Sequence, residues 1–196
     1  MGAYYDIVDA QVEMLPNSAQ QFLNRRHKRD PDRETWNYYN YAYADGVVAL
    51  ADAIAGKVHK EELYLLPLYM LARHSMELSL KASLVEFPPH TGIPVDLEGH
   101  KLINLFKQLC DQVVALGFSI YHEWSWRTEE ILQHIHVHDP NGDRFRYPER
   151  RDGKKFADMA ITFEDLVRCH GVVTVFADAS ADELFAEKGI PLNQRK

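Results

Sequence analysis

The sequence predicts an all-α protein, a bundle of about five helices with one small β-hairpin insert. Three segments, near residues 67–84, 100–116 and 119–136, repeat apolar residues every three to four positions, which is typical of a helix packed on one side. Gly and Pro residues separate these segments where helices usually end. Hydrophobic residues make up 46% of the 196 residues, so the chain can bury a substantial core within one domain.

The chain divides at its first tryptophan. Residues 1–35 are irregular in pattern and strongly charged near their end, which predicts an N-terminal arm rather than a core element. The helical domain is expected at residues 36–196. It opens with the tyrosine-rich run from Trp36 to Tyr43, which leads into a helix at 47–55.

The second expected helix carries four ionisable side chains in an otherwise apolar run. At about 100° per residue these side chains share an arc of roughly 100°, and we call them the polar stripe: Arg73, His74, Glu77 and Lys81. A helix this apolar should be buried, so its charges must be paired, titrated or used in function. A ladder of ion pairs along the helix would satisfy three of them without any function, and both interpretations stay open.

The start of the striped helix and the bounds of the next helix follow from Pro and Gly residues. Pro67 is either the first-turn proline of the striped helix or, if that helix begins near Glu61, a proline inside it. After a loop rich in Pro and Gly, a third helix is expected to open at His100 and to stop at Gly117. Packed as an antiparallel pair, the two helices would bring His100 near one end of the polar stripe.

The fourth expected helix, roughly 119–136, holds an arginine and a histidine on one face. Arg127 and His134 are seven residues apart, which is two helical turns. An arginine can hold a phosphate while a histidine moves a proton, and cleavage of RNA by its own 2′-hydroxyl requires both. These two residues are therefore candidates for catalysis.

The end of that helix contains a run of histidines that invites a metal interpretation. His134, His136 and His138 alternate along the chain and Asp139 follows them. Spacing of two does not place three imidazoles on one side of a helix, and no second cluster completes a site. We predict no metal centre here and interpret the run as a polar helix end.

The predicted β-hairpin covers residues 144–156 and turns at an Asp-Gly pair. In an extended strand Arg144 and Arg146 share one face, and Phe145 and Tyr147 share the other. Two interpretations remain. The arginines with Tyr147 form a phosphate-binding site, or the aromatic rings anchor the hairpin while the arginines pair with carboxylates.

Two capping signals predict two helices in the tail. Thr162 begins a helix that runs through Val175, and Ser180 restarts one that ends at Gly189.

Composition narrows the function classes. The net charge of −7 argues against broad, non-specific nucleic-acid binding, although basic clusters at 25–29 and 144–155 permit a local phosphate contact. The chain has no uncharged apolar stretch of 18 residues, so no membrane span is expected. Two cysteines without a CxxC pair predict a reduced, cytoplasmic setting.

Three short motifs resemble the HEPN superfamily of small helical bundles. They are the helical segment 72–82, the Gly-His-Lys-Leu at 99–102 and the Arg-Tyr-Pro at 146–148, and the resemblance spans roughly residues 40–185. It implies a domain that usually forms a homodimer. Many such domains act in prokaryotic defence, toxin–antitoxin or RNA-processing systems as metal-independent endoribonucleases, so no cofactor is expected. RNA and a protein from a neighbouring gene are the other expected partners.

Active HEPN nucleases carry an arginine and a histidine, separated by four to six residues, in the C-terminal part of the bundle. By this resemblance Arg127 positions the scissile phosphate and His134 acts as acid or base. Thr128 stands where Asn, His or Asp is commoner, and no tyrosine follows two residues after His134. The alternative is a non-catalytic dimeric interaction module whose polar stripe is structural, and a third interpretation is a small-ligand or nucleotide sensor with the stripe in its pocket.

Overall fold

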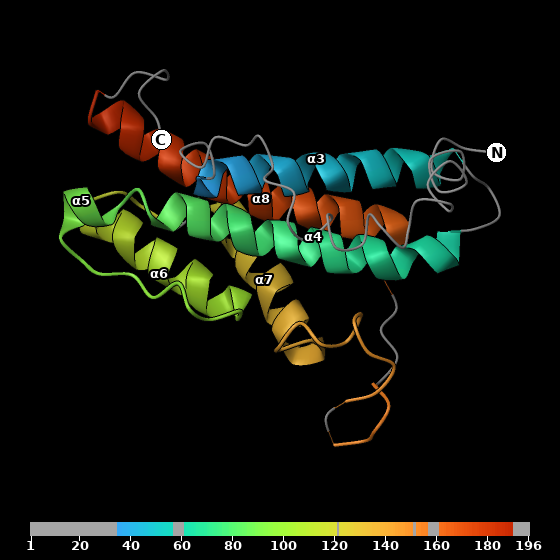
Figure 1. The fold of residues 1–196 in the computed structure, drawn as a ribbon. Helices are drawn as coiled ribbons and strands as arrows, with labels where there is room; N and C mark the ends of the chain where they lie inside the picture. Colours follow the sequence, from blue (N-terminus) through green and yellow to red (C-terminus); the bar gives the residue numbers. More distant parts are fainter. Residues whose placement is uncertain (1–34, 57–60, 121, 151, 157–160, 190–196) are drawn as a thin grey trace, which may run out of the picture. The chain divides into compact units, whose positions relative to one another are not determined.

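The computed structural model describes residues 35–56, 61–120, 122–150, 152–156 and 161–189, so all but one residue of the predicted arm lies outside the described part. The described residues form an all-α fold, which confirms the predicted class (Figure 1). Its helices are α3 (Trp36–Ala55), α4 (Glu61–Leu84), the single turn α5 (Pro88–Thr91), α6 (Leu102–Ala115), α7 (Glu123–His138) and α8 (Phe163–Glu187). None of these helices is long and apolar enough to cross a membrane.

Helix α4 is the central element of the bundle. It packs against α3, α8 and α6, while α7 packs against α8 and α6 (Figure 1). Every residue from Ser75 to Leu84 is buried, as its apolar sequence predicts. The main core joins α4 to α6, α7 and α8, and its fully buried members include Met76, Leu80, Leu84, Leu105, Leu109, Leu132 and Val173.

The contact of α4 with α8 uses small polar residues that the sequence analysis did not single out. Ser75, Ser79 and Ser83 recur every four residues and lie on one side of α4. Ser83 Oγ donates to the carbonyl of Ala177 at 2.8 Å, and Ser75 Oγ lies 3.0 Å from Nε2 of His170. Small side chains let two helix backbones approach closely, and these bonds satisfy their hydroxyl groups.

Helix α4 begins at Glu61, so Pro67 lies inside the helix rather than in its first turn. A proline there cannot donate to the carbonyl four residues earlier. Helix α3 begins at Trp36, earlier than predicted, because Thr35 caps it by accepting from the N–H of Tyr38. The tyrosine-rich run is thus part of the helix.

The antiparallel packing expected for α4 and α6 is wrong. His100, just before α6, contacts Glu77 in α4, and Gln112 near the end of α6 bonds to Thr91, beyond the end of α4. The two helices therefore run in the same direction, and the loop at 92–101 returns along α6 to its start (Figure 1). Gln108 fastens that loop through two hydrogen bonds with the backbone of Asp96.

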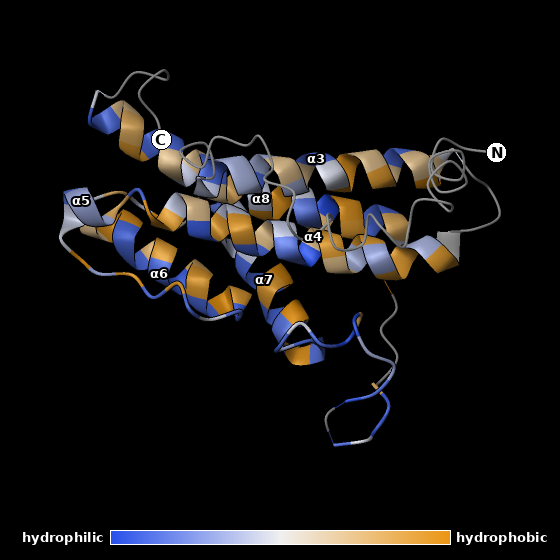
Figure 2. Ribbon diagram, in the orientation of Figure 1, coloured by the Kyte–Doolittle hydropathy of each residue, from blue (hydrophilic) through white to orange (hydrophobic). Residues whose placement is uncertain are grey.

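Two further predictions need correction. The β-hairpin at 144–156 is not seen, because the described residues of this segment form turns joined by one isolated bridge, Glu149 to Lys155. This segment is largely hydrophilic, so it has few side chains with which to pack as a strand (Figure 2). The predicted helix restart at Ser180 is also absent, since α8 continues through it and the Ser180 hydroxyl donates to the carbonyl of Phe176.

Candidate functional site

Three residues of the polar stripe form a buried ion-pair network. The Nζ of Lys81 and the Nδ1 of His100 each lie 2.9 Å from the same oxygen, Oε1 of Glu77. Arg73 Nη1 lies 3.8 Å from the other carboxylate oxygen. Arg73, Glu77 and Lys81 are each no more than 5% exposed, so these charges are almost fully removed from water.

Arg73 links α4 to two segments distant in the sequence. Its Nη2 donates to the carbonyl of His100 at 3.0 Å, and its Nε lies 3.2 Å from Oδ2 of Asp139, which is 2% exposed. We call this group the polar centre: Arg73, Glu77, Lys81, His100 and Asp139. Two cationic and two anionic side chains balance one another within it, as buried charges require.

Asp139 is positioned by the end of α7. Its N–H caps the helix by donating to the carbonyl of Ile135, and its Oδ1 accepts from the N–H of Arg144 at 3.1 Å. The turn that follows passes close to Arg73, because a Cβ at Gly142 would lie 2.6 Å from Nη1 of that arginine. Gly142 also has a φ of +76°, which other residues rarely adopt. The turn therefore encloses the guanidinium.

The sequence predicts that Asp139 lies in a turn or beside the histidine run, and it does not predict a contact with Arg73. The only local signals were an acidic residue at the end of a helix and a glycine three residues later. Neither of these reveals which distant cation the carboxylate will meet.

The ionisation of the polar centre follows from its packing. Burial acts to raise the pKa of Glu77, but hydrogen bonds from Lys81 and His100 outweigh it, and the pKa lies below its usual range. Glu77 is therefore a stable carboxylate at neutral pH. His100 reaches the surface, with 67% of its side chain exposed, and so forms the boundary of the centre with solvent.

His74, the fourth member of the stripe, lies beside the polar centre without an ion pair of its own in the described structure. Its ring meets the ring of Tyr43 edge-on at 4.6 Å. Burial lowers its pKa, and the nearby positive charge of Arg146 lowers it further against the opposing effect of Glu77. A neutral imidazole is thus favoured at this position.

Both residues of the predicted catalytic pair lie exposed on α7. Arg127 is ion-paired with Glu123 one turn earlier, and 61% of its side chain is exposed. The ring of His134 contacts the ring of His138, with 4.5 Å between centroids. Seven residues separate the pair by about 10 Å along the helix axis, so they share a face without direct contact.

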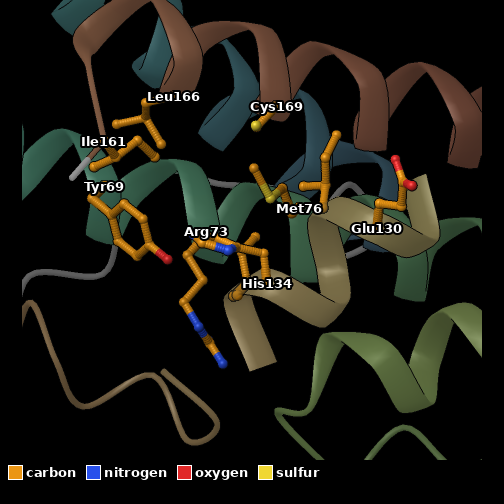
Figure 3. A pocket seen from close by; sticks show the side chains of 10 residues that line it. Tyr69, Arg73, Met76, Glu130, His134, Ile161, Leu166 and Cys169 are labelled. Carbon is orange, nitrogen blue, oxygen red and sulfur yellow. The ribbon is translucent and has the colours of Figure 1, made fainter. Parts of the chain in front are cut away.

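A cavity of about 240 Å³ lies beside His134 (Figure 3). Its wall is mostly apolar and comes from α4, α7, α8 and the residue Ile161 before α8: Tyr69, Arg73, Met76, Glu130, Ile131, His134, Ile135, Ile161, Leu166 and Cys169. Tyr69 is 2% exposed, and among the described residues its hydroxyl has no hydrogen-bond partner. Burial raises the pKa of that hydroxyl, so it remains a protonated donor.

The predicted phosphate-binding residues lie on a turn rather than on a strand. The N–H groups of Arg146 and Tyr147 both donate to the carbonyl of Asp143. In such a turn the side chains do not alternate between two faces as they would in the predicted strand. Phe145 packs on Tyr69 with 3.7 Å between ring centroids, so one of the two aromatic rings anchors the segment. Arg146 and Tyr147 are exposed.

Arg144 lies near two aromatic rings of the same segment. Its guanidinium carbon is 5.7 Å from the ring centre of Phe145 and 5.8 Å from that of Phe156. Cation–π contacts of this kind hold the arginine near the surface. This arrangement favours the interpretation in which Phe145 anchors the segment on the bundle.

The histidine run belongs to a helix end. His134 and His138 are adjacent because they are four residues apart on α7, and Asp139 forms an ion pair with Arg73. In the part of the chain that the structure describes, no three His, Cys, Asp or Glu side chains come together closely enough to hold a metal ion.

Some of the predicted residues thus meet at two places that share Arg73, whereas Arg127 and the predicted phosphate-binding residues lie at neither. One is the polar centre, which reaches the surface at His100, and the other is the cavity beside His134. Searches among protein-family models, curated proteins and solved structures found no match for this chain.

Proposed function

We propose that this chain is a HEPN-like helical protein that cleaves RNA without a metal ion, with Arg127 and His134 as its catalytic pair. The observation that supports this best is the face of α7, which presents both side chains to solvent and places His134 at the rim of a cavity. An exposed arginine can reach a phosphate, and an exposed histidine can exchange protons with a bound substrate.

In the proposed reaction Arg127 leaves Glu123 and binds the scissile phosphate. Exposed ion pairs are weak, so this exchange costs little. His134 either takes the proton of the 2′-hydroxyl or supplies one to the leaving 5′-oxygen, and water completes the other proton transfer. The 2′-oxygen forms a bond to phosphorus as the bond to the 5′-oxygen breaks, giving a 2′,3′-cyclic phosphate and a 5′-hydroxyl.

The test is incubation of purified protein with total cellular RNA in EDTA, beside Arg127→Ala, His134→Ala and the control His136→Ala. We expect the first two variants to lose activity by about 100-fold or more, as removal of an acid–base group does. The melting temperature should hardly change, because both side chains are exposed. RNA cleavage by His134→Ala at the wild-type rate would sink the assignment.

The cellular setting follows from the same resemblance. We propose a cytoplasmic homodimer that acts in a prokaryotic defence or toxin–antitoxin system, with RNA as substrate and a protein from a neighbouring gene as regulator. The net charge of −7 fits a nuclease that contacts RNA through a few local arginines rather than through a broad basic surface.

The alternative function is a non-catalytic dimeric interaction module. It is favoured by the buried and paired polar centre and by aromatic side chains at the start of α3 that are 39–70% exposed: Trp36, Tyr38, Tyr39 and Tyr41. Exposed aromatic residues are common at protein interfaces. In this proposal the aromatic first turns of α3 form the dimer contact, and the polar centre only stabilises the fold.

Sedimentation velocity tests the alternative. We expect a dimer for the wild type, a dissociation constant raised tenfold or more for Tyr41→Ala, and no change for Val137→Ala, an equally exposed side chain on α7. A dimer in which Tyr41→Ala has no effect would rule out the start of α3 as the contact, and a monomeric wild type would rule out the module.

A further inference from the structure

His100 and Glu77 form a pair in which a buried carboxylate holds an exposed imidazole. The Nδ1 of His100 lies 2.9 Å from Oε1 of Glu77, and 67% of the histidine side chain is exposed against 4% of the glutamate side chain. A carboxylate can only accept a hydrogen bond, so Nδ1 carries the hydrogen. The other ring nitrogen, Nε2, lies on the far side of the imidazole, and no residue that the structure describes bonds to it. This nitrogen is therefore left for a ligand.

A pair of this kind suits the transfer of protons. While Glu77 holds the Nδ1–H, the Nε2 of a neutral His100 can take a proton from water or from a hydroxyl group. The carboxylate fixes the orientation of the ring and stabilises the positive charge that then forms on it. Lys81 donates to the same carboxylate oxygen and helps to keep Glu77 ionised. His100 can thus act on a substrate, and Glu77 is its positioning residue.

The imidazole borders a polar pocket at the start of α6. This pocket measures about 440 Å³, and its wall also includes the exposed residues Lys101, Asn104 and Asn141. Arg73 holds the two sides of the pocket together, because it bonds to the carbonyl of His100 and to the carboxylate that precedes the turn at 140–141. Within the described structure, the side-chain nitrogens of Lys101, Asn104 and Asn141 have no partner, so they are free to bind a ligand.

Donors outnumber acceptors in this pocket, which favours a phosphate group. Lys101 brings a positive charge, and the amides of Asn104 and Asn141 can each donate. The first turn of α6 has no acidic residue, and the first N–H groups of a helix favour an anion. Asp96 is the one acidic side chain among the described lining residues. Its Oδ1 accepts from the N–H of Glu98 and so faces its own loop.

The pocket offers a base but no nucleophile of its own. Its described lining contains no Ser, Thr, Tyr or Cys side chain, so the attacking oxygen must come from water. A centre with one imidazole and one lysine suits a phosphate diester that water opens readily. A five-membered cyclic phosphate is such a diester, because opening of the ring relieves its strain. The proposed cleavage of RNA leaves this cyclic group on its product.

We infer that His100 and the pocket at the start of α6 form a second catalytic centre, which hydrolyses the 2′,3′-cyclic phosphate of RNA fragments. The inference rests on the proposed nuclease, which supplies that substrate. Nε2 of His100 takes a proton from water as the water oxygen bonds to phosphorus. The bond from phosphorus to the 2′-oxygen then breaks, and this oxygen receives the proton from Nε2, which leaves a 3′-phosphate. Lys101 binds the phosphate oxygens and offsets their charge.

The test uses 2′,3′-cyclic nucleotides as substrates, and chromatography measures the 3′-monophosphate that forms. The variants are His100→Ala, His100→Asn and the control His90→Asn, which changes an exposed histidine of α5. The amide of His100→Asn keeps a donor near the position of Nδ1, so Glu77 stays paired, but Nε2 is lost. We expect both His100 variants to lower kcat by about 100-fold or more, as loss of an acid–base group does. The control should hydrolyse the substrates at the wild-type rate.

Added imidazole separates a catalytic role from a structural one. Free imidazole can enter the space left in His100→Ala and take the proton of the attacking water, so we expect it to raise the rate of this variant about tenfold or more. The melting temperature of His100→Asn should match that of the wild type. A lowered melting temperature together with no rescue by imidazole would overturn the catalytic role of His100. Hydrolysis by His100→Asn at the wild-type rate would overturn it too.

The two proposals fail separately. A wild type that cleaves RNA but leaves the cyclic nucleotides intact would overturn the second centre and leave the nuclease. Hydrolysis of cyclic nucleotides that depends on His100, without cleavage of RNA, would overturn the nuclease and leave the second centre. Hydrolysis that depends on His134 rather than on His100 would place both reactions on α7 and overturn the second centre.

Discussion

Arg73 is the residue through which the two parts of the candidate site meet. Its guanidinium bonds to the carbonyl of His100 and lies against the carboxylate of Asp139, and its side chain forms part of the cavity wall. A lysine could not make these contacts together, because a planar guanidinium offers several donors in fixed directions. Changes at this position should therefore affect both the polar centre and the cavity.

Glu77 is the residue on which the buried charges of α4 depend. Glu77→Ala leaves Lys81 without its counter-ion and removes one of the two carboxylates near Arg73. We therefore expect the free energy of unfolding to fall by about 3–5 kcal/mol, as when one partner of a buried pair is removed. Urea denaturation measures this change. Glu123→Ala, which breaks an exposed ion pair, should have little effect. A loss near zero for Glu77→Ala would contradict the buried network.

Residue-level prediction from sequence succeeded where the contact is local. The spacing of Arg73, Glu77 and Lys81 along one helix is enough to predict their ion pairs, since residues four apart are neighbours. Asp139 and Tyr69 could not be identified as part of the site in this way. Their roles depend on where a turn and a helix from elsewhere in the chain are placed.

Among the elements, α8 shows why capping signals alone mislead. Ser180 followed by an acidic residue three positions later fits a helix start, but its hydroxyl instead bonds to the carbonyl four residues earlier. Leu184 and Phe185 are buried beyond it, so packing favours continuation of the helix. Tertiary burial outweighs the local preference for a break.

The segment after α7 does not form the predicted hairpin, because here tertiary burial is too small to stabilise the predicted strands. The turn at Gly153 forms as expected, with its N–H donating to the carbonyl of Arg150, and one bridge follows. Asp139 and Asp143 accept backbone bonds nearby, so the chain here is held by local turns and by Phe145. A two-stranded hairpin needs a hydrophobic face to be stable, and among the described residues this segment offers two partly buried rings, Phe145 and Phe156.

For the molecule as a whole, acid should weaken the fold. Burial lowers the pKa of His170 to about 4, so the unfolded chain binds a proton there before the folded one does. The free energy of unfolding should therefore fall by about 3 kcal/mol between pH 6.5 and pH 4 from this residue. Because the pKa of Glu77 is lowered, the free energy of unfolding keeps falling as the pH drops below the ordinary pKa of a carboxyl group. The raised pKa of Asp178 has the opposite effect on the free energy of unfolding.

Urea denaturation between pH 7 and pH 4 measures this dependence. His170→Gln, which keeps a partner for Ser75, should flatten the curve above pH 4, whereas the exposed His90→Gln should leave it as in the wild type. Parallel curves for His170→Gln and wild type would show that His170 does not remain neutral in the folded state.

The loop at 92–101, which returns along α6 so that α4 and α6 run in the same direction, has a kinetic consequence. Neighbouring helices joined by short turns form contacts early, because little chain entropy is lost. The polar centre instead unites residues 73, 100 and 139, so its charges meet only after two long chain segments have closed. Until these segments close, the charges of Arg73, Glu77 and Lys81 are not fully removed from water, so we expect their dehydration to be a late step in folding.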